Sequence, residues 1–167
     1  VESSMGYVPA SGMIFEVGGF NQFETPGINK NGFVAVSFDI AGNFCTASDG
    51  KFGPYSETLS FTQSPCSIGI RGGFDNDYKV LSQSSQITAV SLHEDVADAS
   101  SATYKDFRVE LSKASREIII SGKENSDPNY TELHRLDMSS LSGYSFTVPE
   151  KLKAGLSFST SLSASNF

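Results

Sequence analysis

Side chains that carry oxygen atoms gather in one stretch of this sequence. Asp39 ends an apolar run of strand length, residues 33–39, and Asn43 and Asp49 follow it in a segment that contains turn-forming residues. Carboxylate and amide oxygens, together with a main-chain carbonyl such as that of Ala41, are the ligands that a hard cation such as calcium prefers. The same residues have a simpler use, because Asp and Asn at a turn between strands commonly bond nearby backbone amides. The residues alone leave both uses open.

Short apolar segments on either side of this polar stretch predict the strands that must position it. The runs at 33–39 and 66–70 have the length of strands and look buried. Apolar and charged residues alternate over 107–111, which is typical of a half-buried strand, and 117–121 contains three isoleucines in a row, which suit a sheet core. The expected strands are 13–17, 33–39, 66–70, 78–81, 87–92, 107–111, 117–121, 130–136, 144–148 and a last one through Leu156 and Phe158.

The spacing of these segments and the composition predict the fold class. Many short strands with turn signals between them, and almost no helical periodicity, are typical of a β-sandwich. The 167 residues, 38% hydrophobic and 19% charged, are enough for one globular domain with a core. We therefore expect one all-β domain over residues 1–167, an antiparallel β-sandwich. A net charge of −7 argues against nucleic acid as a partner, and no run of about eighteen apolar residues could insert into a membrane.

The two cysteines, Cys45 and Cys66, lie at the end of one expected strand unit and the start of the next. If these strands pair antiparallel, the two side chains could come within disulfide range. Such a bridge would close a loop of roughly twenty residues, stabilise the fold by about 3 kcal/mol in the chain-entropy model, and require an oxidising compartment. The alternative is a pair of reduced cysteines that act as small apolar residues.

The residues around the polar stretch resemble the metal-loop region of legume-type (L-type) lectins, especially the lectin-like domains of bacterial surface adhesins. The sequences VAVSFDIAGNF (34–44) and SIGIRG (67–72) contain the Phe-Asp strand end of that family, an Asn four residues later, and an Ile-Gly-Ile strand. PASGMIFEVGGF (9–20) is similar to the family's Ala-Asp-Gly strand and Gly-Gly loop, and 104–122 and 153–167 are similar to its later back-sheet and front-sheet strands. The resemblance implies a concanavalin A-like jelly roll.

The resemblance also implies a sugar site that calcium holds rigid. The implied calcium ligands are Asp39, the carbonyl of Ala41, Asn43 and Asp49. The implied sugar contacts are Ser11, Gly19, Asn43 and the ring of Phe44, with Phe52 as the other ring that could take this part. Water could complete the coordination of the calcium ion.

Several positions depart from the family pattern. The sugar-binding Asp of Ala-Asp-Gly is Ser11 here, which loses a charge-assisted hydrogen bond to the sugar. The ligands of a second, transition metal would fall at Ser37 and Ser67, and because neither is a good ligand for such a metal we do not expect one. The chain also begins and ends inside the family's strand pattern. We therefore expect either part of a larger protein or a trimmed version of the fold, incomplete at both ends.

Two functions follow as expectations. The first is a non-enzymatic carbohydrate-binding or adhesion module of a secreted or cell-surface protein, which contacts glycans through a calcium-stiffened loop. The second is a structural domain of an extracellular or cell-surface assembly that keeps the lectin fold, has lost sugar binding and contacts neighbouring protein subunits; Ser11 favours it. A glycan-cleaving enzyme would need two carboxylates about 5 to 10 Å apart, and no motif such as Gly-x-Ser-x-Gly marks a nucleophile, so we do not expect an enzyme.

A sequence motif and the two histidines also have chemistry to be considered. Asn129, Tyr130 and Thr131 form an N-glycosylation sequon after a proline, which a eukaryotic secretory route alone would use and which predicts an exposed loop. His93 and His134 have no cysteine or carboxylate at the spacing of a metal site. We expect both histidines on the surface.

Overall fold

The computed structural model describes residues 12–17, 33–40, 42, 44–45, 62–72, 80–92, 103–142, 147–148, 150 and 154–159. Within these residues, eight strands form two antiparallel sheets, and a single 3-10 turn, η5 (Met138–Ser140), is the one helical element. The strands are β1 (Gly12–Val17), β2 (Val34–Asp39), β3 (Ser67–Gly72), β4 (Val80–Gln83), β5 (Lys105–Ser112), β6 (Glu117–Glu124), β7 (Thr131–Asp137) and β8 (Ala154–Ser159). The expectation of an all-β fold is confirmed for this part of the chain. No helix in it is long and apolar enough to cross a membrane.

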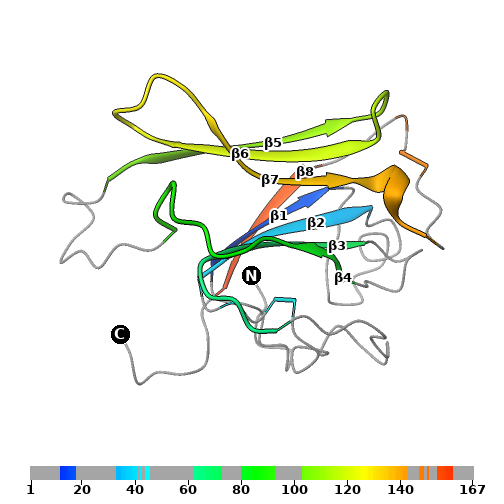
Figure 1. The fold of residues 1–167 in the computed structure, drawn as a ribbon, viewed down its shortest axis with the longest axis horizontal. Helices are drawn as coiled ribbons and strands as arrows, with labels where there is room; N and C mark the ends of the chain where they lie inside the picture. Colours follow the sequence, from blue (N-terminus) through cyan, green and yellow to red (C-terminus); the bar gives the residue numbers. More distant parts are fainter. Residues whose placement is uncertain are drawn as a thin grey trace.

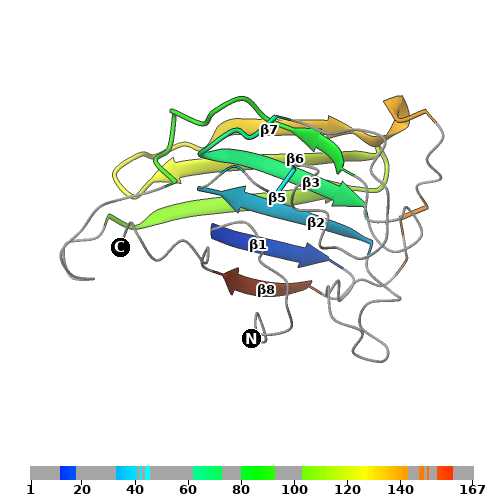
Figure 2. The same ribbon diagram turned by 90° about the horizontal axis from the view of Figure 1, so that it is seen from below.

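The larger sheet has the strand order β4-β3-β2-β1-β8, so that β2 lies at its centre with β3 beside it (Figure 2). In the register of β2 with β3, Val36 lies opposite Ile70, Phe38 opposite Ile68, and Asp39 opposite Ser67. Every residue of β2 and of β3 is buried. Strands that are covered on both faces are mostly apolar or small, which explains why the sequences of β2 and β3 do not alternate; Asp39 and Arg71 are their charged exceptions.

The smaller sheet has the order β5-β6-β7 and lies over the larger one (Figure 1). Residues of β5 alternate between half-buried and exposed, as expected of a strand with one face on the core and the other in water. The register between β6 and β7 shifts between Ile120 and Ser121, which marks a β-bulge. One face of this sheet therefore remains in solvent.

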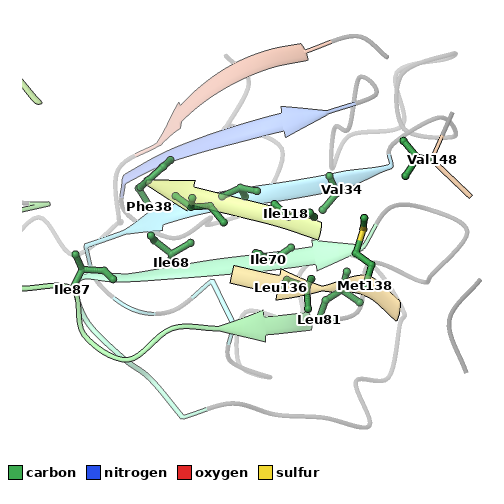
Figure 3. Packing of buried hydrophobic residues seen from close by; sticks show 12 residues of the cluster. Val34, Phe38, Ile68, Ile70, Leu81, Ile87, Ile118, Leu136, Met138 and Val148 are labelled. Atoms are coloured by element: carbon green, nitrogen blue, oxygen red, sulfur yellow. The ribbon is translucent and has the colours of Figure 1, made fainter. Parts of the chain in front are cut away.

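A single hydrophobic core fills the space between the two sheets (Figure 3). The large sheet contributes Val34, Val36, Phe38, Ile68, Ile70 and Leu81, and the small sheet with its 3-10 turn contributes Ile118, Ile120, Leu136 and Met138. The rings of Phe38 in β2 and Phe107 in β5 lie with their centroids 4.5 Å apart. Each buried side chain of this size stabilises the fold by about 1.5–3 kcal/mol, so the core is what holds the two layers together.

The expected strands at 33–39 and 66–70 are confirmed as β2 and β3, with boundaries shifted by one or two residues. The strand expected at 87–92 is wrong. There the chain follows the end of β3 through two main-chain hydrogen bonds, from Ser84 N to Ile68 O and from Ile87 N to Cys66 O, and buries Ile87 in the core without forming a ladder. The strand expected at 144–148 lies mostly outside the described residues.

Candidate functional site

The candidate site begins where the chain leaves β2. We use the term β2 turn for the described residues that follow this strand, namely Ile40, Gly42, Phe44 and Cys45. The carbonyl of Ile40 accepts a hydrogen bond from Cys66 N at 3.1 Å, and the carbonyl of Gly42 accepts one from Ser64 N at 3.2 Å. The β2 turn therefore lies alongside the segment that leads into β3.

Glycine is required at position 42 of this turn. Gly42 has φ of 78°, in the left-handed region that other residues adopt only at a cost. A Cβ at this position would come within 2.2 Å of the main-chain carbon of Ser64, which cannot move without disturbing the neighbouring segment. Close approach of two backbone segments is what the glycine provides.

Asp39 holds the β2 turn from the strand end. Its side chain is buried, with 1% of the residue exposed, and Oδ1 accepts a hydrogen bond from Gly42 N at 2.8 Å. Its Oδ2 accepts a hydrogen bond from Phe44 N at 2.6 Å. Hydrogen bonds to a carboxylate are stronger than neutral ones, and burial increases their contribution. The bonding of nearby amides, one of the two uses that the sequence left open for Asp39, is present in the structure.

Phe44 was expected to stack on a sugar, and this expectation is wrong. Its residue is 0% exposed and its ring lies against the outer face of β3, the face that points away from the smaller sheet. The reason is Gly69, where a Cβ would come within 2.7 Å of Phe44 Cδ1 and 2.5 Å of Cys45 Sγ. The missing side chain leaves the space that the ring and the thiol occupy.

Arg71 of β3 is a buried charged residue beside the β2 turn that the sequence analysis missed. It is 0% exposed, its Nε donates a hydrogen bond to the carbonyl oxygen of Phe44 at 2.8 Å, and its guanidinium carbon lies 5.3 Å from the centroid of the Phe44 ring. Its position two residues after Gly69 places it on the same face of β3 as that glycine. A charged residue inside an apolar run was the only signal, and such residues are rarely fully buried.

The expected disulfide is absent, because both cysteines are free thiols. The Sγ of Cys45 lies over Gly69 and donates to the carbonyl of Ser82 in β4, at 3.9 Å. Cys66 has φ of 53° and its Sγ lies 4.0 Å from the carbonyl of Ile40, on the β2 side of β3. The two thiols thus contact different segments, Cys45 a residue of β4 and Cys66 the residue that follows β2. The alternative of reduced cysteines describes Cys45, which is buried, better than Cys66, which is half-buried.

The structure describes one of the four implied ligands of the expected calcium site. Ala41, Asn43 and Asp49 lie outside the described residues, and Asp39 lies within them. Both oxygens of Asp39 already accept main-chain hydrogen bonds, and the residue is shielded from solvent. Among the described residues, no three His, Cys, Asp or Glu side chains gather where a metal ion could bind. Asp39, the one implied calcium ligand that the structure describes, thus bonds main-chain amides, and the calcium site stays a prediction.

Two other expectations concern surface residues. Ser11, Gly19 and Phe52 lie outside the described residues, so their sugar contacts stay predictions. Asn129 is exposed in the connection between β6 and β7, as its sequon predicted. A glycan attached there would lie on a connection of the smaller sheet, whereas the β2 turn follows a strand of the larger sheet.

His134 was expected on the surface, and this expectation is wrong. It lies half-buried in β7, and its Nε2 is 2.7 Å from Oγ of Ser82 in β4, so that one hydrogen bond joins the two sheets. Burial lowers the pKa of His134 below its ordinary value, since a charged imidazole loses hydration there, and Glu132 acts in the opposite direction. The neutral ring is therefore the form that fits between the sheets.

Comparison with known proteins adds no relative to this picture, since no family model, no curated protein and no solved structure matches the chain. The likeness to L-type lectins therefore rests on the motifs of the sequence. The structure contains two antiparallel sheets with a shared core, and β2 and β3 are neighbours in the larger sheet. The β2 turn follows directly from the Phe-Asp end of β2.

Proposed function

We propose that this chain is a non-enzymatic carbohydrate-binding module of a secreted or cell-surface protein, built as an L-type lectin-like jelly roll. The observation that carries the proposal is the fixed backbone of the β2 turn. Asn43, the residue expected to bond sugar hydroxyls, stands in the sequence between Gly42 and Phe44, and the amides of both neighbours are bonded to Asp39. A binding loop that is ordered before the ligand arrives loses less entropy on binding a weak polar ligand.

A glycan array with matched asparagine variants tests this proposal. Asn43→Ala removes the expected sugar contact, and Asn129→Ala removes an exposed asparagine at the other sheet. We expect the wild type to bind a defined set of glycans, Asn43→Ala to weaken binding about tenfold or more, and Asn129→Ala to bind as the wild type does. A folded wild type that binds no glycan, or a variant Asn43→Ala that binds as well as the wild type, would contradict the proposal.

A second candidate function is supported by the buried positions of Asp39 and Phe44. Both residues were expected at the calcium or sugar site, and both contact the protein itself. This favours a structural domain that retains a lectin-like fold and associates with neighbouring subunits of an extracellular assembly. Sedimentation or light scattering of the full protein tests it: a concentration-dependent assembly without any glycan binding supports this function, and a monomer that binds glycans excludes it.

A further inference from the structure

We propose that Arg71 and Asp39 position the β2 turn from within the protein, in place of a bound calcium ion, so that the domain keeps this turn without metal. Arg71 is a positioning residue in this account, because it acts through its contacts with Phe44 of the turn. The inference does not depend on sugar binding, and it concerns a lectin-like module and a structural domain equally.

Both main-chain polar groups of Phe44, the N–H and the carbonyl, bond charged side chains. The N–H of Phe44 donates to Asp39 Oδ2 at 2.6 Å, and the carbonyl of the same residue accepts from Arg71 Nε at 2.8 Å. An acid and a base on neighbouring strands therefore bind the donor and the acceptor of one residue. The Phe44 ring lies within cation–π distance of the same guanidinium, which adds a third contact.

Both charged side chains are shielded from solvent. Arg71 and Asp39 are 0% and 1% exposed, and a charged group that leaves water loses several kcal/mol of hydration unless the protein supplies hydrogen bonds in its place. The main-chain groups of the β2 turn supply such bonds to both side chains. The turn and the two buried charges are therefore interdependent, since the Nε of Arg71 and both oxygens of Asp39 bond main-chain groups of the turn.

The carboxylate of Asp39 is directed at main-chain amides. In a calcium-held loop the carboxylate oxygens point at the ion, and main-chain carbonyls complete the shell. Here both oxygens of Asp39 point at N–H groups, and the carbonyl of Phe44 points at a guanidinium. Positive charge is thus provided by a side chain that belongs to the fold, and no free cation is required.

Thermal unfolding with and without metal tests the inference on the wild-type protein. We expect the same Tm in excess calcium and in excess chelator, within about 1 °C. Asp39→Asn and Arg71→Lys are each expected to lower the Tm by about 5 °C or more, because Asn removes one acceptor and Lys lacks the N–H fork of Arg. Calcium should not restore either loss. Asp106→Asn on the exposed face of β5 is the matched control and should leave the Tm nearly unchanged.

A titration of the wild type with calcium, followed through the backbone amide signals of Gly42 and Phe44, keeps the inference testable even if a variant does not fold. Signals that stay constant support the internal positioning of the turn. A saturable change of both signals, together with a calcium-dependent rise in Tm, would overturn the inference and restore calcium as the group that holds the turn.

Discussion

The outer faces of the two sheets contain the same kinds of charged residues in opposite surroundings. On the larger sheet, Asp39 and Arg71 are buried beneath the β2 turn and bond main-chain groups. On the smaller sheet, Arg135 lies in solvent and bonds the carboxylates of Glu117 and Glu132, each at 2.6 Å. The ion pairs of the small sheet have shorter distances than any contact of Arg71 that we describe, yet they are expected to contribute far less.

The difference teaches that surroundings decide what a charged contact contributes. The side chains of an exposed ion pair stay largely hydrated and salt screens their attraction, so the net contribution of the pair to stability is small. A buried charge that loses its partner cannot recover water, and the loss is several times larger. Charged residues on the large sheet therefore position a turn, whereas those on the small sheet shape a surface.

The largest effect is expected from removal of the buried guanidinium. Arg71→Met fills much of the same space but leaves the carbonyl of Phe44 without its charged donor and changes the charge balance of a buried region. We expect a loss of about 3 kcal/mol or more in the free energy of unfolding, measured by urea denaturation. A loss below about 1 kcal/mol would show that Arg71 matters no more than a surface arginine.

The next effect compares a glycine of the β2 turn with a glycine of the smaller sheet. Gly42→Ala introduces a Cβ against the backbone of Ser64 at a φ of 78°, and we expect a loss of about 2–4 kcal/mol in stability. Gly122→Ala in β6 meets only the ends of side chains, with Leu133 Cδ1 at 2.8 Å and the Phe107 ring at 3.1 Å. Because these ends can move, its loss should be about 1–2 kcal/mol. The reverse order in urea denaturation would break the comparison.

The contact between the sheets gives a pH dependence. The pKa of His134 is lowered in the folded state, so the unfolded chain binds a proton more readily, and stability falls as the pH drops below about 6.5. Above that pH both states hold the neutral ring and this contribution is complete. We expect the Tm to fall between pH 7.5 and pH 5, and His134→Gln to flatten that slope. An equal slope in both proteins would mean that other groups cause it.

The smallest effect is expected at the surface of the small sheet. Hydrogen bonds from Ser115 and Arg135 lower the pKa of Glu117. A hydrogen bond from Arg135 lowers the pKa of Glu132. Because Arg135 and Glu132 are exposed and Glu117 is half-exposed, Arg135→Gln should change the Tm little, and high salt should remove the difference from the wild type. A loss as large as that of Arg71→Met would erase the contrast between the two faces.

Much of the fold could be predicted from the sequence. The alternation in β5 and the apolar runs of β2 and β3 depend on local periodicity, which the sequence contains directly. Residues 87–92 have the apolar content of a strand, but the sequence does not contain the information that, among the described residues, no strand pairs with them. Strand existence was therefore easier to predict than strand pairing.

Less of the candidate site could be predicted, because its contacts join distant segments. Asp39 was identified as important, but whether its oxygens face an ion or amides depends on the path of the chain after β2. Cys45 contacts β4 and Cys66 contacts the residue after β2, and spacing in the sequence does not reveal which segment each thiol contacts. Arg71 was missed because a buried arginine runs against the usual distribution of charge.

Hydrogen exchange at the amides of Gly42 and Phe44, in the presence of chelator, tests the central claim most directly. Both amides donate to the buried carboxylate of Asp39, whereas the amide of Ser139 donates to the exposed carboxylate of Asp137 at the comparable distance of 2.8 Å and serves as the reference. The account predicts that Gly42 and Phe44 exchange about a hundredfold more slowly than Ser139, and that added calcium changes nothing. Exchange as fast as that of Ser139, or protection that appears only with calcium, would contradict it.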